Sequence, residues 1–178
     1  MPILRDTDDA DSQDSSAHEQ RAHALWPVVA AVPDPEMPPL TIADLGILRS
    51  VHEVDGRIVV TITPTYSGCP AVEYIEDLIT EAVTGTGLPA EQVEVRRELS
   101  PAWSTDWITA AGREKLEMSG ISPPRTLLDG TPVRIGLIAC PQCGSTNTAE
   151  ISRFGSTACK ALYRCNDCSE PFDHVKEL

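Results

Sequence analysis

The pairs Cys140-Pro-Gln-Cys143 and Cys165-Asn-Asp-Cys168 decide how the C-terminal end of this 178-residue chain folds. Twenty-one residues separate the two pairs, close to the roughly 15–20 residues usual in four-cysteine zinc sites. Each Cys-x-x-Cys turn directs two sulfurs at one cation, and two turns complete a tetrahedron, which favours Zn²⁺ or a single iron. Four protein ligands leave no open coordination position, so we expect a structural zinc ribbon rather than a catalytic metal.

Composition and charge limit the cellular compartment and the partners that we expect for this chain. Paired cysteines that bind metal indicate a reducing cytoplasm, where disulfides are rare. No run of about 20 apolar residues and no apolar N-terminal signal core occurs, so we expect neither a membrane span nor secretion. The formal net charge is −13 and no basic cluster accompanies the ribbon. We therefore expect no nucleic acid partner, because phosphate binding requires clustered Lys and Arg.

Outward from the ribbon, the patterns predict an α+β chain with two folded parts. We expect a disordered acidic tail over residues 1–20, an α/β sandwich domain over 21–120, a Pro-rich linker over 121–133 and a small all-β ribbon over 134–178. The order predicted for the larger domain is α-β-β-α-β-α. A metal explains how the short ribbon folds, since burial alone would not stabilise so few residues.

Local signals place the elements of the larger domain. A first helix over 18–32 begins or kinks at Pro27, and Asp55-Gly56 predicts a type I′ turn between two strands within 46–63. Apolar residues at helical spacing follow Pro70, which suits a first helical position. A strand over 92–99 and a helix over 106–118 capped by Thr105 complete the domain.

Cys69 lies in the loop of residues 63–70, which leaves a strand and enters a helix. A cysteine beside a helix N-terminus feels the partial positive charge there, which stabilises the thiolate and lowers the cysteine pKa. Such a thiol attacks electrophiles or holds a soft metal. The alternative is a small apolar side chain packed under the loop.

The sequence also singles out several other polar side chains, and for some of them more than one role remains open. Asp34 and Glu36 alternate with prolines, so we expect a stiff backbone with outward carboxylates. These carboxylates bind a cation, orient a thiol's partner, act as acid and base, or simply form a solvated turn. Asp44 precedes Leu45-Gly46 and predicts an Asx-turn. Cys159 is a spare thiol in the ribbon loop, and the core, backup-ligand and redox interpretations all remain open.

Several of these segments resemble a known family. Asp34-Pro35-Glu36, residues 42–46 and residues 61–70 resemble the SufT-like domain of iron–sulfur assembly factors. In the tail, residues 154–161, 165–168 and 170–172 resemble one branch of that family, the phenylacetate-degradation PaaD (PaaJ) proteins. The resemblance runs from about residue 22 to the C-terminus, and the acidic N-terminal residues fall outside it.

The resemblance implies an accessory function rather than substrate turnover by this chain. PaaD-like proteins associate with a phenylacetyl-CoA epoxidase, whose oxygenase subunit carries a di-iron centre and whose reductase carries FAD and a 2Fe–2S cluster. Cys69 matches the family's functional cysteine, and Asp34 and Glu36 match its acidic motif, which implies transient binding of iron or an iron–sulfur cluster. A homo-oligomer is compatible with the sequence. The alternatives are a rubredoxin-like electron carrier, suggested by the Cys-Pro-x-Cys-Gly turn, and a purely structural subunit.

Overall fold

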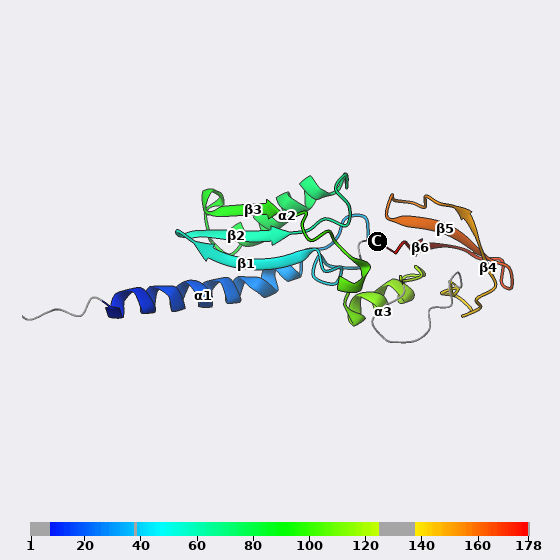
Figure 1. Cartoon of the computed structure of the whole chain (residues 1–178), viewed down its shortest axis with the longest axis horizontal. Helices are drawn as coiled ribbons and strands as arrows, with labels where there is room; N and C mark the ends of the chain where they lie inside the picture. The colour runs from blue at the N-terminus through cyan, green and yellow to red at the C-terminus, as the bar shows by residue number, and fades with distance from the viewer. Residues whose placement is uncertain (1–7, 38, 125–137, 178) are drawn as a thin grey trace, which may run out of the picture.

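The computed structural model describes residues 8–37, 39–124 and 138–177 and contains two small sheets with helices around the first (Figure 1). Each sheet has three strands, in the orders β1-β2-β3 and β4-β5-β6. The predicted α+β class, with an all-β C-terminal part, is confirmed. Within the described ranges, no helix has the length and apolar character needed to cross a bilayer.

The first sheet is built on the predicted hairpin. β1 (Leu48–Val54) runs antiparallel to β2 (Arg57–Ile62). Asp55 and Gly56 between them have φ values of 50° and 74°, as a type I′ turn requires at both central residues. β3 (Val93–Arg97) pairs with β2 in parallel. A parallel pair needs a crossover connection, and α2 (Val72–Thr84), followed by a short 3₁₀ turn, supplies it.

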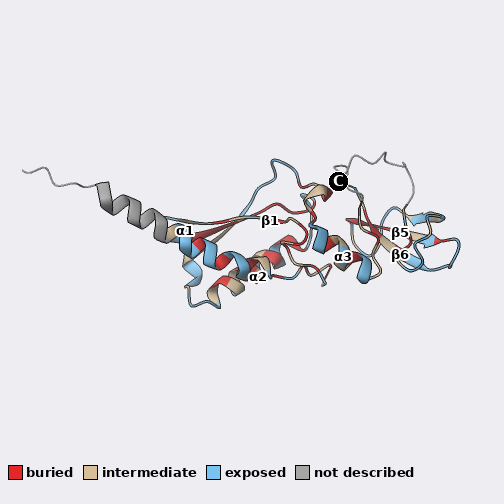
Figure 2. Cartoon of the chain, turned by 90° about the horizontal axis from the view of Figure 1, so that it is seen from below, coloured by how far each residue is buried: buried red, intermediate tan, exposed pale blue. Residues whose placement is uncertain are grey.

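Two helices pack on this sheet and on each other. α1 (Asp8–Ala30) contacts β1 and α2, and α2 contacts β3. Seen from below, α1 and α2 lie side by side in front of the strands, with their buried residues toward the sheet (Figure 2). The helical spacing predicted for α2 is correct, because its buried residues recur every three or four positions. These residues are Val72, Ile75, Ile79 and Val83.

Two helix predictions need correction. α1 begins at Asp8 and continues through Pro27, so the disorder expected for the N-terminal tail is wrong for residues 8–17, and residues 1–7 lie outside the described chain. Acidic residues at a helix start complement its dipole, which favours the longer helix. The single helix expected over 106–118 is instead a 3₁₀ turn, Thr105–Trp107, followed by α3 (Ala110–Met118). Ser104 and Thr109 accept the capping hydrogen bonds, so two caps replace the one expected at Thr105.

The ribbon is an antiparallel sheet with its own small core. Its strands are β4 (Thr148–Ser152), β5 (Lys160–Cys165) and β6 (Pro171–Val175). The Tyr163 and Phe172 rings stack at a centroid distance of 6.0 Å. Phe172 is buried with Cys140 and Cys165, so the apolar contacts of the ribbon gather around the cysteine pairs.

The ribbon also shares the core of the first domain. Cys159 and Val175 are buried in the same cluster as the side chains beneath the first sheet. Ser122, at the start of the predicted linker, pairs with the ribbon: its N–H donates to the Asp173 carbonyl at 2.9 Å and its carbonyl accepts from the Val175 N–H at 3.0 Å. The predicted linker residues 125–133 lie outside the described residues. The first domain and the ribbon therefore form a packed seam.

Candidate functional site

The four ribbon cysteines form a group suited to one metal ion. The sulfurs of Cys140, Cys143, Cys165 and Cys168 all lie within 4.8 Å of one another. Two pairs across the site, Cys140–Cys168 and Cys143–Cys165, have Sγ···Sγ distances of 3.7 and 3.6 Å. A tetrahedral cation with metal–sulfur distances of about 2.3 Å separates its ligands by about 3.8 Å. All four thiols are free of disulfides, and their spacing fits the predicted tetrahedral site.

Backbone amides prepare this group for a cation. The Cys168 N–H donates to the Cys165 Sγ at 3.5 Å. This bond, a further amide from Asp167 and hydrogen bonds from the Cys168 and Cys143 thiols lower the pKa of Cys165 to about 7. A thiolate that accepts backbone N–H bonds is a ready metal ligand. Cys140 and Cys165 are buried while Cys143 and Cys168 are exposed, so one side of the site faces the ribbon core and the other faces solvent.

Cys69 lies where the sequence predicts it, in the loop that enters α2. Its sulfur accepts a hydrogen bond from the Ala71 backbone N–H, at the N-cap of α2. The expected lowering of its pKa is nevertheless wrong. Burial raises the pKa of Cys69, and the negative charges of Glu36, Asp34 and Cys159 raise it further. One amide at a helix start does not outweigh half-burial and three acidic neighbours.

Asp34 and Glu36 share this neighbourhood with Cys69, but they do not both point outward. Asp34 is buried, and its Oδ1 accepts from the backbone N–H groups of Glu36 and Met37 at 2.9 and 2.8 Å. Burial raises the pKa of Asp34 despite these bonds. Glu36 is half-buried, and burial and the Asp34 charge both raise its pKa. Asp34 thus shapes the turn, and Glu36 is the more accessible carboxylate.

The ribbon places two more polar side chains in this neighbourhood. Cys159 is buried and interacts electrostatically with Cys69 and Glu36. Lys160 is only 4% exposed, and its Nζ lies 3.5 Å from the Glu36 carbonyl oxygen and 3.7 Å from the Asp173 carboxylate. Lys160 was not predicted from the sequence. The sequence gives little indication that this lysine is buried, because a lysine at the start of a β-strand is ordinarily a solvated residue.

We call Asp34, Glu36, Cys69, Cys159 and Lys160 the seam cluster. The first three come from loops of the first domain, and the last two come from the ribbon. The core interpretation of Cys159 is confirmed by its burial, although the core that holds it belongs mainly to the first domain. Its ligand and redox alternatives remain predictions. The cluster joins two thiols and two carboxylates to one buried ammonium.

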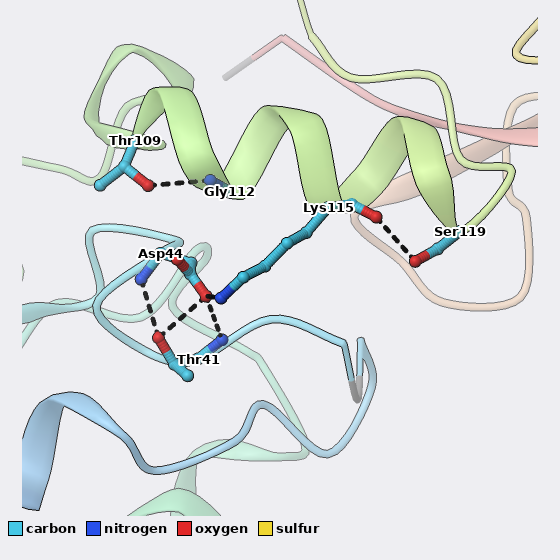
Figure 3. A network of polar contacts seen from close by, with 6 residues as sticks. All are labelled: Thr41, Asp44, Thr109, Gly112, Lys115 and Ser119. Carbon is cyan, nitrogen blue, oxygen red and sulfur yellow. Dashed lines mark hydrogen bonds and ion pairs between the residues drawn. The ribbon is translucent and has the colours of Figure 1, made fainter.

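Asp44 stabilises the fold beside this site, but the predicted Asx-turn is wrong, because its carboxylate accepts from Thr41, three residues earlier, and not from a residue two positions later. Its Oδ2 accepts from the Thr41 N–H at 2.9 Å and the Thr41 hydroxyl at 3.0 Å, and Lys115 of α3 reaches it at 2.5 Å (Figure 3). Gly112 allows this close approach, because a Cβ at that position would lie 2.7 Å from the Asp44 carbonyl oxygen. Burial raises the pKa of Asp44, but Lys115 and Thr41 outweigh it and hold the pKa below its usual value.

Comparison with known families divides the chain as the structure does. Residues 24–96 match the family described as iron–sulfur cluster assembly protein, and residues 131–176 match the PaaD zinc beta ribbon domain. The seam cluster thus draws Asp34, Glu36 and Cys69 from the first match and Cys159 and Lys160 from the second.

Individual relatives agree with this division. A protein of Escherichia coli (strain K12), named provisionally as a subunit of 1,2-phenylacetyl-CoA epoxidase, is 48% identical over 88% of this chain and 93% of its own length. An Fe-S protein maturation auxiliary factor of Porphyromonas gingivalis is 31% identical over 46% of this chain and 77% of its own. The crystal structure of a DUF59 domain from Bacillus anthracis covers 57% of this chain and 95% of its own, with a TM-score of 0.51 and 26% identity.

Proposed function

The chain belongs to the PaaD family of phenylacetyl-CoA epoxidase subunits, and from this premise we propose that it is a maturation factor for a metal centre of that epoxidase. Its cargo is iron or an iron–sulfur cluster, held transiently and passed to the oxygenase or the reductase. The iron–sulfur assembly match over residues 24–96 supports the class of cargo. The relative from Escherichia coli, which aligns over most of both chains, supports the recipient system.

The observation that carries this proposal is the meeting of Cys69 with Asp34 and Glu36. The thiol and both carboxylates have raised pKa values because they are buried beside one another. A cation among them would reverse this cost, since it stabilises the charged form of every acidic group that it contacts. Thiolate and carboxylate are also ligands that iron accepts. We therefore assign Cys69 as the cargo ligand, with Glu36 as the assisting carboxylate and Asp34 as the residue that shapes their loop.

The ribbon metal has a separate role in this proposal. We propose that Cys140, Cys143, Cys165 and Cys168 hold one structural Zn²⁺. The second pair continues Cys-Asn-Asp-Cys-Ser and lacks the proline and glycine of the first, which favours zinc over a rubredoxin-like iron. The metal would hold the ribbon together, supply no redox chemistry and present the ribbon surface to epoxidase subunits.

One experiment tests the cargo role directly. The full chain is expressed with zinc, purified anaerobically and titrated with Fe²⁺, and iron and zinc are then measured per chain. We expect one zinc that remains throughout and one further iron, which Cys69→Ser removes. Iron in the ribbon in place of zinc, with a visible thiolate-to-iron band in the protein as purified, would favour the electron carrier instead.

A further inference from the structure

The ribbon carries an exposed apolar stretch that begins in β4 and continues into the loop after it. Phe154 is 66% exposed, more than any other Phe, Tyr or Trp side chain among the described residues, and Ile151, three positions earlier, is 54% exposed. We call Ile151, Arg153, Phe154 and Lys176 the ribbon patch. We propose that the ribbon patch is the surface through which this chain binds the protein that receives its cargo. The inference rests on the proposed function and names its docking surface and the chemistry of the partner.

Contacts with the end of β6 hold the ribbon patch in place. Directly after β6, the Lys176 ammonium donates to the Arg153 carbonyl at 3.3 Å and lies 4.7 Å from the centre of the Phe154 ring. The Phe154 N–H donates to the Ser152 hydroxyl at 3.2 Å. The Phe154 ring is therefore exposed although its backbone and one ring face are held. A side chain that is held before binding loses little conformational entropy when a partner covers it.

The shape of β4 favours docking through side chains rather than through its backbone. β4 is an outer strand of the ribbon sheet, and an open strand edge is a place where a strand of another protein adds. The register of β4 against β5 shifts between Glu150 and Ser152, which leaves Ile151 as the extra residue of a β-bulge. A bulge interrupts the ladder of hydrogen bonds and disfavours strand addition. The exposed Ile151 and Phe154 side chains therefore suit contact with a folded surface.

The charges of the ribbon patch indicate which folded surface fits it. Arg153 is exposed, and in the part of the chain that the structure describes no carboxylate pairs with it. The chain as a whole has a formal net charge of −13, so an acidic partner would be repelled elsewhere and attracted here. Complementary charges of this kind orient a partner and speed its encounter. The ribbon patch therefore fits an apolar pocket bordered by Asp or Glu side chains.

A second copy of this chain fits the ribbon patch poorly. In a symmetric dimer, the same patch meets itself across the two-fold axis. Arg153 and Lys176 would then approach the same two cations of the other copy, and like charges across an interface are unfavourable. The charge of the ribbon patch therefore favours a different, acidic protein over self-association.

The position of the ribbon patch favours the cargo recipient as that protein. The loop that begins at Phe154 leads to Cys159 and Lys160 in the seam cluster. The Lys176 N–H donates to the Cys159 carbonyl at 3.0 Å, and the Lys160 ammonium lies 3.5 Å from the Glu36 carbonyl oxygen. A protein bound at the ribbon patch is therefore held beside the proposed cargo site, as transfer of a metal between two proteins requires.

The test measures binding of the full, zinc-loaded chain to the purified oxygenase and, separately, to the purified reductase of the epoxidase by isothermal titration calorimetry. Phe154→Ser removes the exposed ring, and Arg153→Glu reverses an exposed charge. Leu99→Ser is the matched control, because Leu99 is an apolar side chain of the first domain that is 56% exposed. Zinc per chain and Fe²⁺ binding are measured for every variant, to verify that the ribbon and the cargo site are intact.

We expect the wild type and Leu99→Ser to bind one of the two proteins with equal affinity. Phe154→Ser should bind it at least about tenfold more weakly, as when a side chain that dominates an interface is truncated. Arg153→Glu should also bind more weakly, and its deficit should shrink as salt is added, because salt screens exposed charges.

Three results would overturn this inference. They are wild-type affinity in both patch variants, a wild type that binds neither protein, and a wild-type dimer that Phe154→Ser dissociates in sedimentation. None of these results concerns iron. The proposed function fails separately, if the wild-type chain binds no Fe²⁺ beyond its zinc.

Discussion

Replacing Asp44 by alanine tests whether this carboxylate stabilises the fold rather than the cargo site. Its Oδ2 accepts two hydrogen bonds from Thr41, at 2.9 and 3.0 Å, and the Lys115 ammonium at 2.5 Å. Asp44 is only 8% exposed, and its removal would leave the part-buried Thr41 N–H without its partner. We expect Asp44→Ala to destabilise the first domain without changing metal content.

The magnitude follows from the contacts that are lost. Loss of a side-chain cap costs about 0.5–2 kcal/mol, and an unsatisfied buried donor costs about 1–3 kcal/mol. These two costs overlap, so we expect the free energy of unfolding to fall by about 2–3 kcal/mol. Lys115→Met is the matched control. The lysine side chain is 37% exposed, and an ion pair with that much solvent contact contributes about 0–1 kcal/mol.

Urea unfolding followed by tryptophan fluorescence measures both variants. Trp103 reports on this region, because its indole N–H donates to the Leu45 carbonyl at 2.9 Å and the ring is buried. We expect the Lys115→Met midpoint to stay near the wild-type value while the Asp44→Ala midpoint falls clearly. Equal losses in the two variants would refute the reasoning, because the ion pair would then dominate over the turn that Asp44 closes.

Because Asp44 has a lowered pKa, its stabilisation is complete above its unfolded value of about 3.9 and is lost as pH falls through the folded value. Acid unfolding of Asp44→Ala should therefore depend less steeply on pH than that of the wild type, and parallel curves would contradict this. Gly112→Ala should lower the free energy of unfolding by about 1–3 kcal/mol, because the added methyl group overpacks against the Asp44 carbonyl. A higher free energy of unfolding in urea would contradict this and would mean that the better helix propensity of alanine outweighs the overpacking. Cys165→Ser should abolish the ribbon zinc and also weaken the first domain, whose core includes Cys159 and Val175, and an unchanged tryptophan unfolding midpoint would argue against the shared core. In metal-free protein, iodoacetamide should modify Cys69 more slowly at pH 7 than it modifies a free thiol and faster as pH rises, because the raised pKa keeps the thiol protonated; mass spectrometry that finds faster modification at pH 7 would contradict this.

Local signals in the sequence predicted the elements that depend on nearby residues. The Asp55-Gly56 turn and the apolar spacing of α2 each arise within a few positions, and both are confirmed. The ribbon cysteines are another such case, since two short turns define the set that the structure gathers. The two caps before α3 could not be predicted in this way, because Thr105, Ser104 and Thr109 are equally plausible caps by residue type.

Features that depend on distant contacts could not be read from the sequence. The position of Cys69 at a helix start was predictable, but its raised pKa depends on burial and on Glu36, which lies 33 residues earlier in the chain. Lys160 and Cys159 reach the neighbourhood of Glu36 only because the ribbon packs on the first domain. No sequence pattern predicts this packing of two separate parts of the chain. The sequence therefore predicted the site residues of the first domain, but not the residues that the ribbon adds to them.

The most direct test of the central claim measures metal in the proposed recipient. The epoxidase oxygenase and reductase are isolated from cells grown with the wild-type chain, with Cys69→Ser or without the chain, and iron per oxygenase and 2Fe–2S cluster per reductase are determined. The proposed maturation role predicts that at least one of the two proteins is made in normal amount but contains much less metal, both without the chain and with Cys69→Ser. Equal metal content in all three preparations would contradict it.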